Sequence, residues 1–125
     1  MSFKVLIIDD SALARRTVRS SLESIGCQVE EAPDGNRGLE IFFLSPPQLV
    51  ILDMVMEGMY GLEVLMKMLQ LNPEVRVIVA TADIQRTTAE EAKAAGAKGI
   101  INKPMNRRKL VEAVNTVMAG GEVWN

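Results

Sequence analysis

FKVLIIDD, residues 3–10, places four consecutive aliphatic side chains directly before two aspartates. Four similar short apolar runs follow, at residues 27–32, 49–52, 75–80 and 99–101. Most of these runs are nearly continuous in Val, Ile and Leu, whereas a strand with one solvated face would alternate apolar and polar side chains. Continuous runs are typical of parallel strands that are covered on both faces. The sequence therefore predicts five buried parallel strands.

Segments with helical spacing separate these runs. Apolar side chains recur at intervals of three and four in four segments, at residues 14–25, 39–43, 62–69 and 110–118. A fifth segment, Gln85 to Ala95, offers only small side chains to a buried face. The alternation predicts an α/β fold, a flavodoxin-like doubly wound (βα)5 domain whose parallel five-stranded sheet has the order 2-1-3-4-5, and residues 1–125 form a single domain.

Composition limits the chemistry and the partners. The 125 residues include 14 Lys and Arg against 16 Asp and Glu, a formal net charge of -2, so no general attraction to nucleic acid or to an anionic membrane is expected. There is no histidine and one cysteine, Cys27, which excludes an intramolecular disulfide and a zinc site of the usual Cys/His type. No stretch approaches the ~18 apolar residues of a membrane span. These features predict a cytoplasmic protein.

Five polar residues follow the ends of the predicted strands. Asp9 and Asp10 end the first strand, Asp53 ends the third, Thr81 ends the fourth, and Lys103 follows the fifth. The carboxyl ends of parallel strands meet at one edge of the sheet, and the predicted order places the first and third strands side by side. We therefore expect the three aspartates to converge.

Converging carboxylates need a cation or a proton between them, because two unit charges ~4 Å apart repel by about 4 kcal/mol at an effective dielectric constant of 20. Oxygen ligands that leave room for waters and a phosphate oxygen favour Mg²⁺ over a fully caged Ca²⁺. Lys103 and Thr81 add an ammonium group and a hydroxyl donor suited to phosphoryl oxygens. Asp53 stands alone on its strand and is the predicted nucleophile towards phosphorus, which would give an aspartyl phosphate.

Four motifs in this order resemble one known family. They are Ile7-Ile8-Asp9-Asp10-Ser11, Leu52-Asp53-Met54 followed by Gly58-Met59-Tyr60-Gly61, Ala80-Thr81-Ala82, and Asn102-Lys103-Pro104. Together they are similar to the receiver domains of two-component response regulators of the CheY type, over essentially the whole chain. The resemblance implies that Asp53 accepts a phosphoryl group from a sensor histidine kinase or a phosphotransfer protein.

The resemblance also implies roles for the remaining site residues. Asp10 and Asp53 would bind Mg²⁺ directly, Asp9 would act largely through water, and the backbone carbonyl of Val55 would complete the protein ligands. Thr81 and Lys103 would contact the phosphoryl group, and a movement of Thr81 would displace the helix after the fourth strand. The segment at residues 85–95, which offers only small side chains to a buried face, suits a movable element.

Several positions depart from the family pattern. Ile100 stands where an aromatic residue is usual, three positions before Lys103, while Glu57 and Met105 replace a usual proline and phenylalanine and Tyr60 replaces a usual acid. Glu57 predicts a stronger dependence on the cation. An apolar Val55 cannot orient a water, so a long-lived phosphoryl state is expected unless Asp83 or an outside phosphatase substitutes.

These features favour a phosphorylation switch that changes its affinity for a downstream protein target and is not a turnover enzyme. One alternative is a receiver-like binding adaptor that does not need phosphorylation, which Ile100 makes conceivable. A second is an aspartate-nucleophile phosphohydrolase, which would want acids that alternate along the first strand and not the adjacent pair Asp9 and Asp10.

Two surface features remain open from sequence. Arg15, Arg16 and Arg19 on the first predicted helix could dock a partner or form a solvated face. Trp124 follows two glycines near the end of the chain, and we expect it to lie in a loose tail.

Overall fold

The fold was obtained as a computed structural model, which describes residues 2–56, 58, 60–82 and 86–124, and for Arg86 and Thr87 describes the backbone alone. Five strands alternate with five helices, and a short sixth strand follows. The strands are β1 (Lys4–Ile8), β2 (Gln28–Ala32), β3 (Leu49–Asp53), β4 (Arg76–Thr81), β5 (Gly99–Asn102) and β6 (Val123–Trp124). The helices are α1 (Ala12–Glu23), α2 (Gly35–Leu44), α3 (Gly61–Leu71), α4 (Arg86–Ala94) and α5 (Arg107–Met118).

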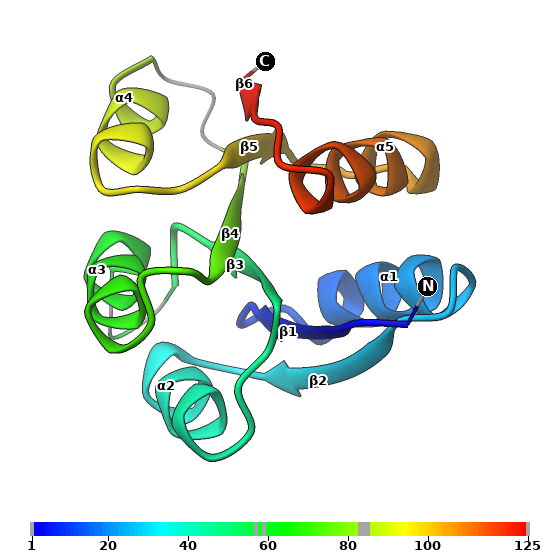
Figure 1. Ribbon diagram of the computed structural model, residues 1–125, viewed down its shortest axis with the longest axis horizontal. Helices are drawn as coiled ribbons and strands as arrows, with labels where there is room; N and C mark the ends of the chain where they lie inside the picture. Colours follow the sequence, from blue (N-terminus) through cyan, green and yellow to red (C-terminus); the bar gives the residue numbers. More distant parts are fainter. Residues whose placement is uncertain (1, 57, 59, 83–85, 125) are drawn as a thin grey trace.

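All strand pairs are parallel, and the sheet has the order β2-β1-β3-β4-β5-β6. The predicted doubly wound fold and the order 2-1-3-4-5 are therefore confirmed, and the first five strands begin and end within one residue of their predicted limits. Helices α1 and α5 cover one face of the sheet, and α2, α3 and α4 cover the other (Figure 1). This topology aligns the carboxyl ends of β1, β3, β4 and β5 at one edge.

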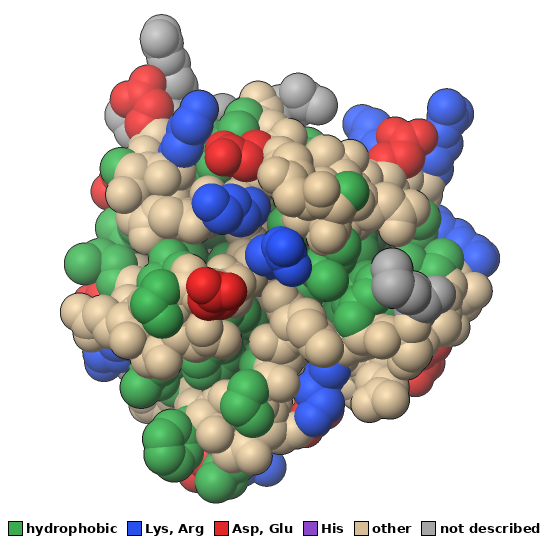
Figure 2. Space-filling view, in the orientation of Figure 1, with side chains coloured by type: hydrophobic (Ala, Val, Ile, Leu, Met, Phe, Trp, Pro, Cys, Tyr) green, Lys and Arg blue, Asp and Glu red, His purple; other side chains and the backbone are tan. Residues whose placement is uncertain are grey.

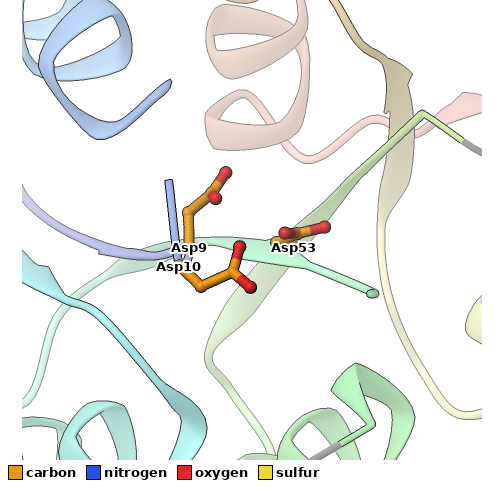
Figure 3. Close-up of side chains that lie close together, drawn as sticks. All are labelled: Asp9, Asp10 and Asp53. Atoms are coloured by element: carbon orange, nitrogen blue, oxygen red, sulfur yellow. The ribbon is translucent and has the colours of Figure 1, made fainter. Parts of the chain in front are cut away.

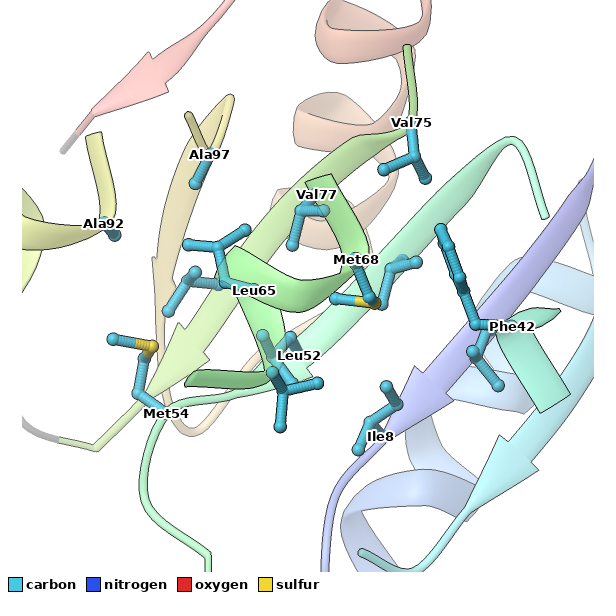
Figure 4. Close-up of a cluster of buried hydrophobic side chains, with 14 of the residues drawn as sticks. Ile8, Phe42, Leu52, Met54, Leu65, Met68, Val75, Val77, Ala92 and Ala97 are labelled. Carbon is cyan, nitrogen blue, oxygen red and sulfur yellow. The ribbon is translucent and has the colours of Figure 1, made fainter. Parts of the chain in front are cut away.

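Each face of the sheet has its own apolar core. Figure 4 shows the core beneath α2, α3 and α4, where Ile8 and Leu52 of the sheet meet Phe42, Leu65 and Met68 of the helices. The second core joins the opposite sheet face to α1 and α5. Every residue of β3 is buried, because β3 lies inside the sheet and both of its faces are covered.

The helix starts follow local capping chemistry. The side chains of Ser11, Asp34 and Asn106 accept hydrogen bonds from backbone N–H groups in the first turns of α1, α2 and α5. Such bonds satisfy donors that a helix leaves unpaired at its beginning. In α1 the capping residue directly follows the two aspartates, so the cap fixes where the helix begins relative to them.

The end of the chain differs from the prediction of a loose tail. Val123 and Trp124 form β6, which pairs with Gly99 and Ile100 of β5. The pairing is possible because residue 99 is a glycine: a Cβ there would lie 2.8 Å from the carbonyl oxygen of Val123. The Trp124 ring also packs against the core beneath α2, α3 and α4, and the Lys93 Nζ lies 5.5 Å from the centroid of the ring. The prediction was wrong because a two-residue strand has no periodicity to detect.

The surface mixes charges of both signs. On the face shown in Figure 2, Lys and Arg side chains are interspersed with Asp and Glu, and apolar side chains gather over α2 and α3. Among the helices in the described part of the chain, none has the length and apolar character that crossing a bilayer requires.

Candidate phosphoryl-acceptor and metal site

Asp9 directly follows β1 and is fixed at its backbone and side chain. Its side chain is almost fully buried, and its N–H donates to the carbonyl oxygen of Ala32 at the end of β2, over 3.1 Å. The N–H of Ser11 donates to Asp9 Oδ1 over 2.9 Å. The residue that caps α1 thus holds one carboxylate oxygen of Asp9 in place, and Asp10, which lies between Asp9 and Ser11, is exposed.

Asp53 is the last residue of β3 and is also buried, at 5% exposure. The N–H of Val55 donates to its Oδ1 over 3.1 Å, so the backbone after the strand folds back over the carboxylate. Gly61 keeps this loop close, because a Cβ there would lie 2.6 Å from the carbonyl oxygen of Asp53, and its N–H donates to Met54. A glycine at residue 61 therefore holds the loop against the end of β3.

The three predicted aspartates lie together. Each of Asp9, Asp10 and Asp53 offers an oxygen, and these oxygens lie within 4.8 Å of one another. Figure 3 shows the three side chains at the neighbouring ends of β1 and β3. The cluster could hold a metal ion, and its all-oxygen donor set suits a hard cation.

Lys103 directly follows β5 and reaches the cluster along the same edge of the sheet. Its Nζ lies 2.6 Å from Asp9 Oδ2 and 3.4 Å from Asp53 Oδ2. Burial lowers the pKa of Lys103, but the hydrogen bond to Asp9 and the charges of Asp53 and Asp9 outweigh burial, so the net shift is upwards. Lys103 is thus held as a cation, and one ammonium among three carboxylates leaves two negative charges, which match a divalent cation.

Burial also governs the charge of Asp53. Desolvation raises its pKa, and the nearby charge of Asp9 acts in the same direction. The Val55 N–H and Lys103 lower the pKa but do not cancel the rise. A further positive charge at the cluster would favour the carboxylate form, which is the form that can act as a nucleophile.

The site residues predicted from the sequence differ in how far they are exposed to solvent. An open pocket of about 520 Å³ lies over the cluster, and the residues that line it are Asp10, Asp53, Val55, Ala82 and Lys103. Asp9 is buried beside this pocket. Thr81, the last residue of β4, has no exposed surface, and its carbonyl oxygen accepts from the Lys103 N–H over 2.8 Å. Thr81 therefore ties the ends of β4 and β5 together next to the pocket.

Sequence reasoning did not identify the contact between Arg15 and Asp9. The Nη1 of Arg15 donates to the carbonyl oxygen of Asp9 over 2.6 Å. The six-residue separation spans a strand end and a helix turn, so no periodic pattern signals the contact. Arg15 and Arg19 form ion pairs with Glu31 of β2, whereas Arg16 is exposed. The predictions that concern Glu57 and Asp83 fall outside the described residues.

Comparison with known proteins places this geometry in a family. Residues 5–115 match the family model of the response regulator receiver domain. This chain belongs to that family. The predicted resemblance to CheY-like receiver domains is thereby confirmed, and the family is one of two-component systems.

Receiver relatives match the chain over nearly its full length. The chemotaxis protein CheY of Thermotoga maritima is 33% identical over 118 residues, which cover 94% of this chain and 98% of that protein. The sporulation initiation phosphotransferase F of Bacillus subtilis is 33% identical over 114 residues, covering 91% and 92% of the two chains. A CheY-like receiver domain from Methanospirillum hungatei superposes with a TM-score of 0.90 at 28% identity and covers 95% of each chain. The sequence relatives and the solved structure therefore indicate the same family and the same fold.

Proposed function

We propose that this receiver domain is a phospho-accepting signalling switch in which Asp53 accepts a phosphoryl group with the help of Mg²⁺. The observation that supports the proposal best is the approach of the Lys103 ammonium to both Asp9 and Asp53, at 2.6 and 3.4 Å, beside an open pocket. A phosphate bound in this pocket would meet a buried nucleophile, a fixed cation and a cluster of oxygen ligands. No feature of an ordinary solvated turn requires these groups to converge.

The residues fit a divalent cation by charge and by donor type. Asp10, Asp53 and the backbone carbonyl of Val55 would hold Mg²⁺ directly, with Asp9 acting through water. The cation would neutralise negative charge on the equatorial phosphoryl oxygens. Lys103 would exchange part of its contact with Asp9 for a phosphoryl oxygen, and the Thr81 hydroxyl would contact another.

The transfer step needs no proton from the nucleophile. A carboxylate oxygen of Asp53 forms a bond to phosphorus while the bond from phosphorus to the nitrogen of a donor phosphohistidine breaks. The released imidazole keeps the electron pair of that bond and takes a proton from water. The domain would then lose the group slowly and act through changed affinity for a downstream protein target. It would catalyse only its own phosphorylation and is not a turnover enzyme.

Intact mass after incubation with a small acyl phosphate and Mg²⁺ tests the proposal. Wild-type chain should gain one phosphoryl group, and Asp53→Asn should gain none. The matched control is Asp34→Asn, which changes an exposed helix-capping aspartate that is not a member of the cluster and should leave the gain intact. Equal labelling of wild type and Asp53→Asn would refute the assignment of the acceptor.

The same assay separates the alternatives. A receiver-like adaptor that works without phosphorylation would show no mass gain in the wild type, an outcome made conceivable by Ile100 at the position of the usual aromatic residue. Ile100 is buried on β5 and pairs with Trp124 of β6. Continuous release of phosphate from small esters, without an accumulated phosphoryl state, would instead indicate a phosphohydrolase.

A further inference from the structure

Arg15 connects the first helix to the peptide between the two adjacent aspartates. Its Nη1 donates to the carbonyl oxygen of Asp9 over 2.6 Å, and its Nε donates to Glu31 Oε1 over 3.0 Å. The side chain is only 17% exposed. The accepting carbonyl belongs to the peptide that links Asp9 to Asp10, so the guanidinium fixes the plane from which the Asp10 side chain departs.

The contact completes the restraint of Asp9. Its N–H is bonded to Ala32, its Oδ1 to the Ser11 N–H, and its Oδ2 to Lys103. The carbonyl oxygen is the remaining polar atom of Asp9, and Arg15 binds it. Asp10 is exposed, and its side chain departs directly after the peptide that Arg15 binds.

The chemistry of arginine suits this position. Two N–H groups of one planar guanidinium serve a backbone carbonyl and a carboxylate at the same time, which the single ammonium of lysine cannot do with the same directions. Glu31 also forms an ion pair with Arg19. Burial raises the pKa of Glu31, but its hydrogen bonds and charge interactions with Arg19 and Arg15 together outweigh burial and lower the pKa, so the carboxylate form is favoured.

From these contacts we propose that Arg15 is a positioning residue for the divalent cation. It acts through the Asp9–Asp10 peptide and does not touch the cation or the phosphoryl group. The inference rests on the proposed function, which supplies the cation. Groups that orient metal ligands typically affect metal affinity by 10- to 100-fold.

The direction in which the cation affinity changes when Arg15 is substituted distinguishes a positioning role from a purely electrostatic one. Removal of a positive charge near a cation site strengthens cation binding if the charge alone matters, because like charges repel. Removal of a positioning contact weakens cation binding. Arg15→Met therefore gives opposite results for the two roles, and Arg15→Lys keeps the charge while it loses the two-acceptor geometry.

Arg19 provides a matched control. It lies one helical turn after Arg15, pairs with the same Glu31, and donates to the carbonyl oxygen of Val29 on β2. Arg19→Met therefore removes a comparable tie between α1 and β2 and leaves the donor to Asp9 in place. If the loss of a tie between α1 and β2 were enough to weaken cation binding, Arg15→Met and Arg19→Met should weaken it equally.

Titration calorimetry with Mg²⁺ on the full chain tests the proposal. We expect the Kd to rise about 10-fold in Arg15→Met and severalfold in Arg15→Lys, and to stay within about twofold in Arg19→Met. Unchanged or tighter binding by Arg15→Met, or an equal loss of affinity in Arg19→Met, would overturn the positioning role of Arg15 and leave the proposed function intact. A wild-type chain that binds no Mg²⁺ would overturn the cation in the proposed function and this inference with it.

The phosphorylation rate as a function of Mg²⁺ concentration gives a second readout. In Arg15→Met the half-saturating Mg²⁺ concentration should rise about 10-fold while the rate at saturating Mg²⁺ stays within about threefold of wild type. A merely structural role would lower the saturated rate as well. A lowered saturated rate at an unchanged half-saturating concentration would therefore contradict the proposal.

Discussion

The two helices that flank the site are held by different means. Helix α1 buries Val18 and Leu22 and is tied to β2 through the ion pairs of Arg15 and Arg19 with Glu31. Helix α4 is shorter, and the residues of it that are buried in the described part are small: Thr88 and Ala92. Less apolar area is removed from water by small side chains, so α4 gains less stability from packing.

This difference matches the tasks proposed for the two sides. The side of α1 holds carboxylates whose positions must not change when a cation binds, and fixed ligands reduce the cost of binding. The side of α4 follows Thr81, where the proposed switch requires movement. A helix that moves must be drawn from the less stable elements of a fold.

The largest effect should come from the apolar contact of α1. Leu22 has no exposed surface, so Leu22→Ala should lower the free energy of unfolding by about 2–5 kcal/mol through a cavity. Ala92→Gly, in α4, should cost only about 1 kcal/mol, mostly in helix propensity. Urea denaturation measures both, with Leu13→Ala on the exposed face of α1 as the control, expected within about 0.5 kcal/mol of wild type. Equal losses at Leu22 and Ala92 would end the comparison.

A second effect should come from the strand that covers β5. In Gly99→Ala the new methyl group would lie 2.8 Å from the carbonyl oxygen of Val123, so β6 must shift or detach at a cost of about 1–3 kcal/mol. The same substitution in a chain that ends at Gly121 should cost less than about 0.5 kcal/mol, because the clashing strand is gone. A cost that is the same in both chains would show that β6 does not restrain this edge.

A smaller effect should come from the contact between β6 and α4. Lys93 lies over the Trp124 ring, and a cation–π contact at an exposed site contributes about 0.5–1 kcal/mol. Trp124→Leu and Lys93→Met, alone and combined, form a double-mutant cycle in which the coupling energy should have this size. Hydrogen exchange of the α4 amides should accelerate in both single variants. Zero coupling would mean that β6 holds α4 by apolar packing alone.

The smallest effect should depend on pH. The pKa of Glu31 is lowered from its ordinary value of 4.5, so its ion pairs stabilise the fold above pH 4.5, and this stabilisation is lost as the pH falls through the lowered value. Glu31→Gln should therefore cost up to about 1 kcal/mol at pH 7 and almost nothing at the acid limit of folding. Thermal unfolding across pH 3–7 measures the difference. A cost that grows towards low pH would contradict the assigned ion pairs.

Much of this protein could be predicted from local patterns. The runs that end in Asp9 and Asp53 predicted buried strands because short continuous aliphatic runs are typical of a parallel sheet covered on both faces. The order of these strands then predicted that their polar ends converge, which the distances from Lys103 to Asp9 and Asp53 agree with. Strand β6 was not predicted, because two residues are too few to show a periodic pattern. Its pairing also depends on Gly99, which lies opposite it on β5.

Local sequence patterns are enough to predict the alternation of strands and helices, the parallel sheet, and the acids and the lysine that share one edge. These follow from hydrophobic periodicity and chain connectivity, which are properties of neighbouring residues. The folded chain adds three contacts that no local pattern indicates: Lys103 lies closer to Asp9 than to Asp53, Arg15 binds the peptide between the aspartates, and Trp124 packs against Lys93. Such contacts depend on the distances between elements, and packing of the whole chain sets those distances.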